Sequence, residues 1–286
     1  MPIHARLNSK AMTPTLHSFA SEKQAVKIPG GAAESQSDGG RSRATPWDYF
    51  DRVYCITLAG RTDRRRRAEA EFAAVGLAGK VEFRIFQKHP TDAEEGIFES
   101  HMQCLRAGLE GGDKILIFED DVTFHRFSLK AMEDAVRFMQ SDRDWRIFFL
   151  GCFVDSSRRS SFPSVIQIKF RCLAHAYVVN REFAELLVEQ RWSGVAYDDL
   201  LRKIVGRGRA YALYPAIASQ SGSPTDNGKT VGIDRIRRLL GGVRRLQRWN
   251  EFSTLYLKEL IAAHVILVGI LIAVAFLVRR FIVEDQ

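Results

Sequence analysis

Short apolar runs alternate with longer amphipathic segments along the middle of the chain. Runs of five to seven residues between polar segments are typical of strands, and six of them stand at 52–58, 81–86, 114–118, 146–150, 175–179 and 210–214. Apolar residues at helical spacing predict helices over 62–75, 96–109, 128–139, 181–189 and 197–205. This alternation predicts an α/β fold with a mostly parallel sheet and helices on both of its faces. Ligands of such sheets bind at the carboxyl ends of the strands.

The last apolar run differs from the others in its length. Residues 260–278 (LIAAHVILVGILIAVAFLV) form 19 consecutive positions without a formal charge. As a helix this run would be about 28 Å long, which is close to the hydrocarbon thickness of a bilayer. A helix buried in a protein core is the alternative, but a core helix of this length normally carries a polar stripe. The run therefore predicts a single-pass transmembrane helix, followed by a short tail at 279–286.

Arginines are concentrated just before this span. Six lie within 235–249, whereas only Arg279 and Arg280 follow it. Because Lys and Arg favour the cytoplasmic side of a membrane, we expect the large domain to be cytoplasmic. Residues 231–259 mix arginines with apolar and aromatic side chains, which favours a basic amphipathic juxtamembrane segment on an anionic membrane surface. A solvated basic linker is the alternative.

The formal net charge of +8 lies mainly at the two ends of the 286-residue chain. Residues 1–45 carry +3 and residues 231–286 carry +4, which leaves +1 on residues 46–230. A nucleic-acid-binding domain usually carries its own basic face, so we expect no nucleic-acid partner. Residues 1–45 are rich in Ser, Ala and Gly, which predicts a disordered arm before an α/β domain over 46–230.

Three adjacent acids follow the apolar strand at 114–118. Glu119, Asp120 and Asp121 would repel one another at a buried strand end unless a cation neutralised them. Mg²⁺ and Mn²⁺ prefer such oxygen ligands. On an extended strand Glu119 and Asp121 share a face, so we expect these two to hold a metal ion and Asp120 to face the other way, toward ribose or sugar hydroxyls. A solvated acidic turn is the alternative.

The loop after the first strand is a candidate for diphosphate binding. It begins at Thr57 and Leu58 and places Arg61 and Arg64 where a diphosphate could lie. Residues 65–67 are expected to form a charged helix face instead. No GxGxxG or GxxxxGK[ST] motif occurs, so dinucleotide and P-loop sites lack their signature.

Ser100 and His101 stand near the start of the helix that precedes the acidic strand. They are candidates for sugar or phosphate contacts. A structural histidine is the alternative for His101. No GxSxG or HExxH motif occurs, which disfavours hydrolase triads and zinc proteases.

Six segments stand in a recognisable order between residues 52 and 226. They are VYCITLAGRTDR, GIFESH, ILIFEDDV, LAHAYVVNREFAELL, DDLL and YPAIASQ. Together they resemble the motifs of glycosyltransferase family 25, which includes lipopolysaccharide galactosyltransferases and collagen galactosyltransferases. Each motif alone is weak, but six in the right order are more specific.

The resemblance implies a GT-A-like fold and a nucleotide-sugar donor, UDP-galactose or a relative. It also implies a divalent cation, Mn²⁺ or Mg²⁺, held by the acidic motif to stabilise the leaving diphosphate. On this basis the donor contacts are expected from Thr57, Leu58, Arg61, Arg64, Ser100 and Asp120, and the metal ligands from Glu119 and Asp121.

A sugar acceptor needs a base to remove the proton of its hydroxyl group. We expect Asp198 or Asp199 to be that base, and we include His101 among the catalytic candidates. Stabilisation of a helix N-terminus is the alternative for the two aspartates.

The sequence thus predicts a membrane-anchored glycosyltransferase that acts on a lipid-linked or cell-surface glycan. The alternative is a catalytically inactive nucleotide-sugar-binding or scaffold subunit of a polysaccharide assembly system. The complete Glu119–Asp121 triplet favours the enzyme, because an inactive subunit has no need of three buried acids.

Overall fold

The computed structural model describes residues 44–222, 237 and 239–284. The predicted arm over 1–45 lies outside the described residues except for its last two positions. Part of the predicted juxtamembrane segment, 231–236 and 238, also lies outside them.

The described residues form one eight-stranded sheet in the order β2-β1-β3-β8-β5-β9-β7-β6. Its strands are β1 (Arg52–Leu58), β2 (Glu82–Phe86), β3 (Lys114–Glu119), β5 (Ile147–Phe149), β6 (Phe153–Arg159), β7 (Val165–Cys172), β8 (Ala176–Asn180) and β9 (Ala210–Leu213). The pairings give six strands one direction, and only β7 and β8 run against them. This confirms the predicted α/β class with a mostly parallel sheet.

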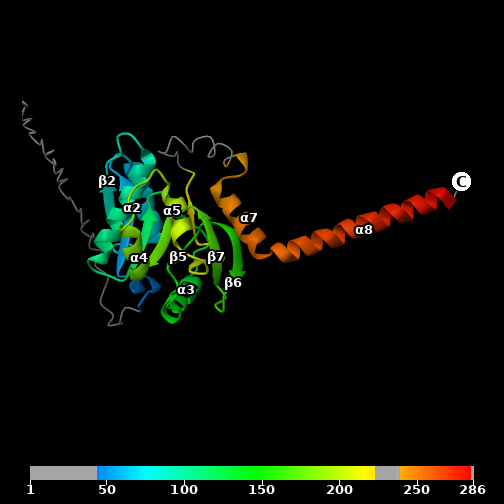
Figure 1. Cartoon of the computed structure of the whole chain (residues 1–286), viewed down its shortest axis with the longest axis horizontal. Helices are drawn as coiled ribbons and strands as arrows, with labels where there is room; N and C mark the ends of the chain where they lie inside the picture. The colour runs from blue at the N-terminus through cyan, green and yellow to red at the C-terminus, as the bar shows by residue number, and fades with distance from the viewer. Residues whose placement is uncertain (1–43, 223–236, 238, 285–286) are drawn as a thin grey trace, which may run out of the picture.

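Helices cover both faces of the sheet (Figure 1). They are α1 (Thr62–Ala74), α2 (Ala93–Leu109), α3 (Leu129–Ser141), α4 (Arg181–Val188) and α5 (Tyr197–Ile204), with a 3₁₀ turn, η1, at Pro46–Tyr49. One core joins α1, α3 and η1 to the sheet, and a second core joins α2, α4 and α5 to the other face. Within β3, Leu116 and Phe118 belong to the first core, whereas Ile115 and Ile117 belong to the second. A strand covered on both faces is apolar at every position, which is why this strand was readable from sequence.

Several elements were not foreseen. The hairpin of β6 and β7 escaped prediction because β6 (FVDSSRR) is mostly polar, and a second, two-stranded sheet pairs β4 (Val122–Phe124) with β10 (Ala218–Gln220). The helix α2 begins three residues earlier than predicted, because the Asp92 carboxylate accepts a hydrogen bond from the Glu94 N–H at 2.9 Å.

The juxtamembrane segment contains a helix, α7 (Val243–Leu255), that packs along β6 and touches β10. The Asn250 side-chain amide accepts a hydrogen bond from the Val154 N–H at 2.8 Å and donates one to the Val154 carbonyl at 2.9 Å. This segment is therefore attached to the α/β domain by specific hydrogen bonds.

The last helix, α8 (Leu257–Glu284), projects away from the domain (Figure 1). Its stretch Leu257–Arg280 is long and apolar enough to cross a membrane, and none of its most apolar part is buried against the protein. The alternative of a buried core helix is therefore wrong. That α8 crosses a membrane, and the side on which the domain would then lie, both stay predictions.

Candidate functional site

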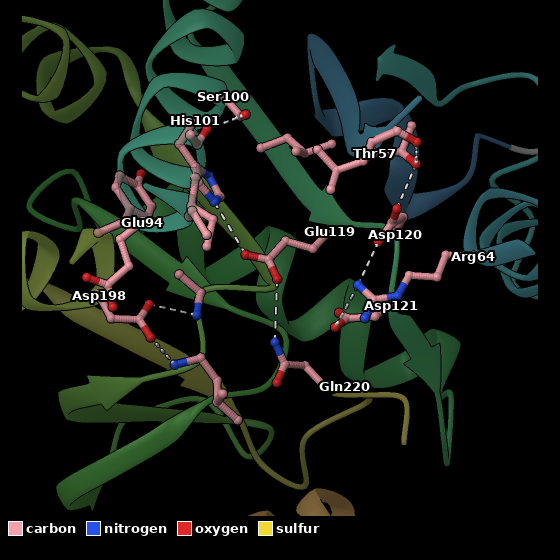
Figure 2. A pocket seen from close by; sticks show the side chains of 18 of the residues that line it. Thr57, Arg64, Glu94, Ser100, His101, Glu119, Asp120, Asp121, Asp198 and Gln220 are labelled. Carbon is pink, nitrogen blue, oxygen red and sulfur yellow. Dashed lines mark hydrogen bonds and ion pairs between the residues drawn. The ribbon is translucent and has the colours of Figure 1, made fainter. Parts of the chain in front are cut away.

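A cavity of about 370 Å³ opens at the carboxyl ends of β1 and β3, the edge where ligands of this fold class were expected. Its other walls come from the segment after β2, the first turns of α2, the turn between β7 and β8, and the starts of α5 and α7. Residues singled out from the sequence that line it are Thr57, Leu58, Arg64, Ser100, His101, Glu119, Asp120, Asp121 and Asp198. Figure 2 shows most of these side chains pointing into one space.

The acidic triplet lies at the carboxyl end of β3. Glu119 is the last residue of β3, and the chain then turns at Asp120 and Asp121 before β4 begins. All three residues line the cavity. Arg64 contacts both Asp120 and Asp121, so Asp120 is not turned away from Asp121 as expected, because a turn does not keep the alternation of a strand.

Asp120 is held by two side chains from β1 and α1. The Thr57 hydroxyl donates a hydrogen bond to Asp120 Oδ2 at 2.6 Å, and the Arg64 guanidinium donates to Oδ1 at 3.3 Å. The same guanidinium lies 3.8 Å from Asp121 Oδ2. Asp121 Oδ1 is buried and has no hydrogen-bond partner among the residues that the structure describes. One carboxylate oxygen of the site is thus buried without a hydrogen-bond partner among those residues.

The electrostatic balance of the site favours a bound cation. Burial, with repulsion from Asp198 and Asp120, raises the pKa of Glu119 to about 8. Burial and repulsion from Glu119 raise the pKa of Asp121 to about 8, although Arg64 opposes the rise. An added positive charge would lower both pKa values and stabilise the two carboxylates in their charged form.

The donor set fits a hard divalent cation only in part. No group of three or more His, Cys, Asp or Glu side chains in the described part of the chain is arranged to hold a metal ion by itself. Two carboxylates, with further oxygens from a substrate diphosphate, are nevertheless a usual ligand set for Mg²⁺. The unpartnered Asp121 Oδ1 and the raised pKa of Glu119 agree with that arrangement.

His101 belongs to a buried chain of hydrogen bonds behind Glu119. Its Nε2 lies 3.4 Å from Glu119 Oε1, and its Nδ1 lies 2.8 Å from the Tyr177 hydroxyl, which lies 2.8 Å from the Tyr197 hydroxyl. The imidazole also stacks on the Tyr197 ring with 4.1 Å between centroids. Burial lowers the pKa of His101 to about 3, so the ring is neutral and has one donor and one acceptor. With Glu119 ionised, His101 donates to Glu119 and accepts from Tyr177. These contacts make His101 a positioning residue for Glu119.

Gln220 is a site residue to which the sequence pattern assigned no role. It comes from β10, and its Nε2 donates to Glu119 Oε2 at 3.4 Å, so both oxygens of Glu119 have a donor (Figure 2). The signal was present, because Gln220 closes the YPAIASQ motif. Its role required knowing that β10 pairs with β4 directly after the acidic turn.

The two candidate bases, Asp198 and Asp199, have different surroundings. Asp198 lines the cavity, and its carboxylate accepts hydrogen bonds from the N–H groups of Leu173 and Ala174 at 2.8 and 3.1 Å. Asp199 is about half exposed and pairs with Arg202 at 2.8 Å. Burial raises the pKa of Asp198. Only Asp198 is therefore placed to meet a substrate in this cavity.

Replacing Asp198 with asparagine is expected to destabilise the protein by about 1–3 kcal/mol, because an amide cannot accept both backbone hydrogen bonds. Leu173, in the turn that Asp198 holds, has a φ of 75°, so the turn depends on outside support. Thermal unfolding of Asp198→Asn and Asp199→Asn would compare the two. We expect Asp199→Asn to change stability by less than about 0.5 kcal/mol. Equal losses would contradict the assignment.

Two other predicted donor contacts lie differently from expectation. Arg61 does not line the cavity, and its guanidinium pairs with Asp63, with Nε 3.1 Å from Oδ1. The Ser100 hydroxyl lines the cavity but already donates to the Gly96 carbonyl at 2.6 Å. Lys88 and Arg237, which were not predicted, do line it. The basic residues that line the cavity are thus not all those that the sequence suggested.

No family model matches the sequence, and no curated protein matches it. Solved structures that match include A197 from STIV, which is 15% identical with a TM-score of 0.39, over 57% of this chain and 81% of that one. A glycosyltransferase involved in the glycosylation of the major capsid of PBCV-1 is 13% identical with a TM-score of 0.38, over 65% of this chain and 99% of that one. A putative glucose-1-phosphate thymidylyltransferase from Bacillus anthracis is 13% identical with a TM-score of 0.37, over 64% and 76% of the two chains. Similarity at this level says nothing about what this chain binds.

Proposed function

We propose that the chain is a membrane-anchored hexosyltransferase that moves a sugar from a nucleotide-sugar donor to a lipid-linked or cell-surface glycan. The observation that carries this proposal is the acidic turn at the end of β3, which opens into the cavity with Asp121 Oδ1 unpartnered among the described residues. The resemblance of the six sequence segments to family 25 points to galactose and to a UDP-linked donor.

Different residues of the cavity would contact the diphosphate, the ribose and the metal ion. Arg64 lies beside Asp120 and Asp121, where it can also meet the negative charge of a diphosphate. Thr57 and Asp120 form a hydrogen-bonded pair that can receive ribose hydroxyls. Glu119, fixed by His101 and Gln220, and Asp121 would hold Mn²⁺ or Mg²⁺. When bound, that ion would stabilise the negative charge on the departing diphosphate.

Asp198 is the proposed base for the acceptor hydroxyl. In the view of Figure 2 it lies across the cavity from Arg64, with Glu119 between them. Because the pKa of Asp198 is raised, its ionised carboxylate takes up a proton more readily than an ordinary aspartate does. An acceptor that enters on that side would place its hydroxyl between Asp198 and the donor sugar.

The test is a donor screen with the full chain in detergent. Nucleoside diphosphate release would be followed for a panel of UDP-, GDP- and dTDP-sugars with Mn²⁺ and again with EDTA. We expect release from one UDP-sugar that depends on the metal, and a loss of at least about 100-fold in Glu119→Gln. Glu99→Gln, at an exposed position of α2, is the matched control and should keep full activity.

Binding of a nucleotide sugar without turnover would favour the inactive subunit over the enzyme. Absence of binding for every donor would contradict both.

A further inference from the structure

The helix α7 turns its polar side toward the domain. Gln247 and Glu251 are only 2% and 6% exposed, and Asn250 is bonded to both backbone groups of Val154. Gln247 also donates to the Ala218 carbonyl at 3.0 Å. The rotation of this helix about its axis is therefore fixed.

The opposite side of α7 combines arginines with aromatic rings. Arg244, Arg245 and Arg248 are exposed, and Trp249 and Phe252 beside them are 66% and 41% exposed. We call these five residues the basic–aromatic face. Its arginines form no ion pair within the part of the chain that the structure describes.

The face itself carries no acid, because Glu251, the one carboxylate of α7, is on the buried side of the helix. A water-facing helix normally buries its apolar groups, whereas α7 buries Gln247 and Glu251 and exposes Trp249 and Phe252 beside its arginines. The pattern indicates that the outward side of α7 has a partner that is both anionic and apolar.

The position of α7 identifies that partner. It lies on the side of the domain from which α8 leaves, and it runs across the direction of α8 (Figure 1). A bilayer crossed by α8 would extend across the axis of α8 and so along the outward side of α7. Aromatic rings continue from Trp249 through Phe252 to Tyr256, with 6.3 and 5.0 Å between successive centroids, up to the first residue of α8.

We propose that the basic–aromatic face binds the anionic headgroups of the bilayer that α8 crosses, so that the α/β domain lies against the membrane surface. Arginines are attracted to anionic lipid, where each strengthens attachment by about fivefold. Tryptophan is favoured at the interface between headgroups and hydrocarbon. This inference rests on the membrane anchoring within the proposed function, and it does not depend on the donor, the metal or the reaction.

The test uses the full chain in vesicles and the fluorescence of Trp249. Neutral phosphatidylcholine vesicles would be compared with vesicles that contain about 30% phosphatidylglycerol. A lipid with a quencher near its headgroup would report contact. Subtracting the signal of Trp249→Phe isolates Trp249 from the buried Trp47 and Trp145 and from Trp192. Alkaline carbonate washing of the same vesicles would show separately whether α8 is inserted.

We expect quenching of Trp249 to be at least about twofold stronger in the anionic vesicles. The triple variant Arg244→Gln/Arg245→Gln/Arg248→Gln should fall to the level of the neutral vesicles while it stays resistant to carbonate. The matched control removes the same charge from three exposed loop arginines, as Arg143→Gln/Arg191→Gln/Arg207→Gln, and should behave as the wild type.

Three results would overturn the inference. Equal quenching in the two kinds of vesicle would show contact without recognition of anionic lipid. Retention in the vesicles without quenching of Trp249 would mean that the face serves a soluble partner, such as an acidic protein or a nucleic acid. Release of the chain by carbonate would refute the anchoring itself and leave the donor screen as the test of the reaction.

Discussion

Replacing Asp121 with asparagine is expected to lower turnover of the donor by at least about 100-fold and, at the same time, to stabilise the ligand-free protein by about 1–2 kcal/mol. Activity falls because the amide has one oxygen and no charge to offer a cation. Stability rises because Asp121 is buried beside Glu119, and one of its oxygens has no partner among the described residues. A substitution that harms function and helps folding is what a residue retained for chemistry should show.

The stabilisation by Asp121→Asn should depend on pH in a definite direction. The folded-state pKa of Asp121, about 8, is above its unfolded value near 3.8. The unfolded chain therefore ionises first, and the wild type loses stability as the pH rises from about 4 to about 8. Thermal unfolding at pH 5 and pH 8.5 should show a larger difference between variant and wild type at the higher pH.

Asp144→Asn is the matched control for that experiment, since Asp144 is exposed in the loop after α3. It should change neither turnover nor unfolding. Wild-type turnover in Asp121→Asn would exclude Asp121 as a metal ligand, and identical unfolding at both pH values would contradict the electrostatic strain assigned to it.

Replacing Gly151 with alanine is expected to destabilise the fold by about 3 kcal/mol and to lower the melting temperature by roughly 6–12 °C. A Cβ at this position would lie 1.9 Å from the Ala218 carbonyl oxygen and 2.7 Å from Gln247 Nε2. A backbone carbonyl cannot move as a flexible side chain can, so the contact between Gly151 and the start of β10 must open. Because β10 carries Gln220, loss of donor turnover should accompany the lower melting temperature.

Gly60→Ala is the control for this substitution. Gly60 also lies in a turn, but a Cβ there would have no neighbour within 4 Å, and its φ is not in the left-handed region. We expect a change of less than about 0.5 kcal/mol. A melting temperature of Gly151→Ala within 2 °C of the control would show that β10 can shift at little cost, contrary to the close packing described here.

The sequence predicted best those elements whose buried residues form an unbroken apolar run. β1 was predicted with its observed bounds, because its middle is continuously apolar. β6 was not, because Asp155, Ser156 and Arg158 face solvent at the end of the sheet. The sequence also did not show which side of α7 is buried, because a helix that buries Gln247 and Glu251 has no apolar stripe on that side.

The candidate site was predictable where neighbours in sequence are neighbours in space. The acidic triplet and the Thr57–Arg64 loop satisfy this condition. Gln220 does not, because 101 positions separate it from Glu119, and only the pairing of β10 with β4 brings the two together. The choice between Asp198 and Asp199 depended on the rotation of α5 about its axis. This rotation places Asp198 at the cavity and leaves Asp199 about half exposed. The rotation of a short helix is set by its packing against the rest of the fold, which a local sequence pattern does not show.

Asn250 also covers backbone groups at an edge of the sheet. β6 is an outermost strand, and an outermost strand offers unpaired N–H and C=O groups to a strand of another molecule. The Asn250 amide occupies both groups of Val154, and the rest of α7 lies along the same strand. A fragment that ended at residue 230 would lack α7 and so lose this cover. A fragment that keeps this edge of β6 covered along the whole of α7 extends through Leu255, the last residue of that helix.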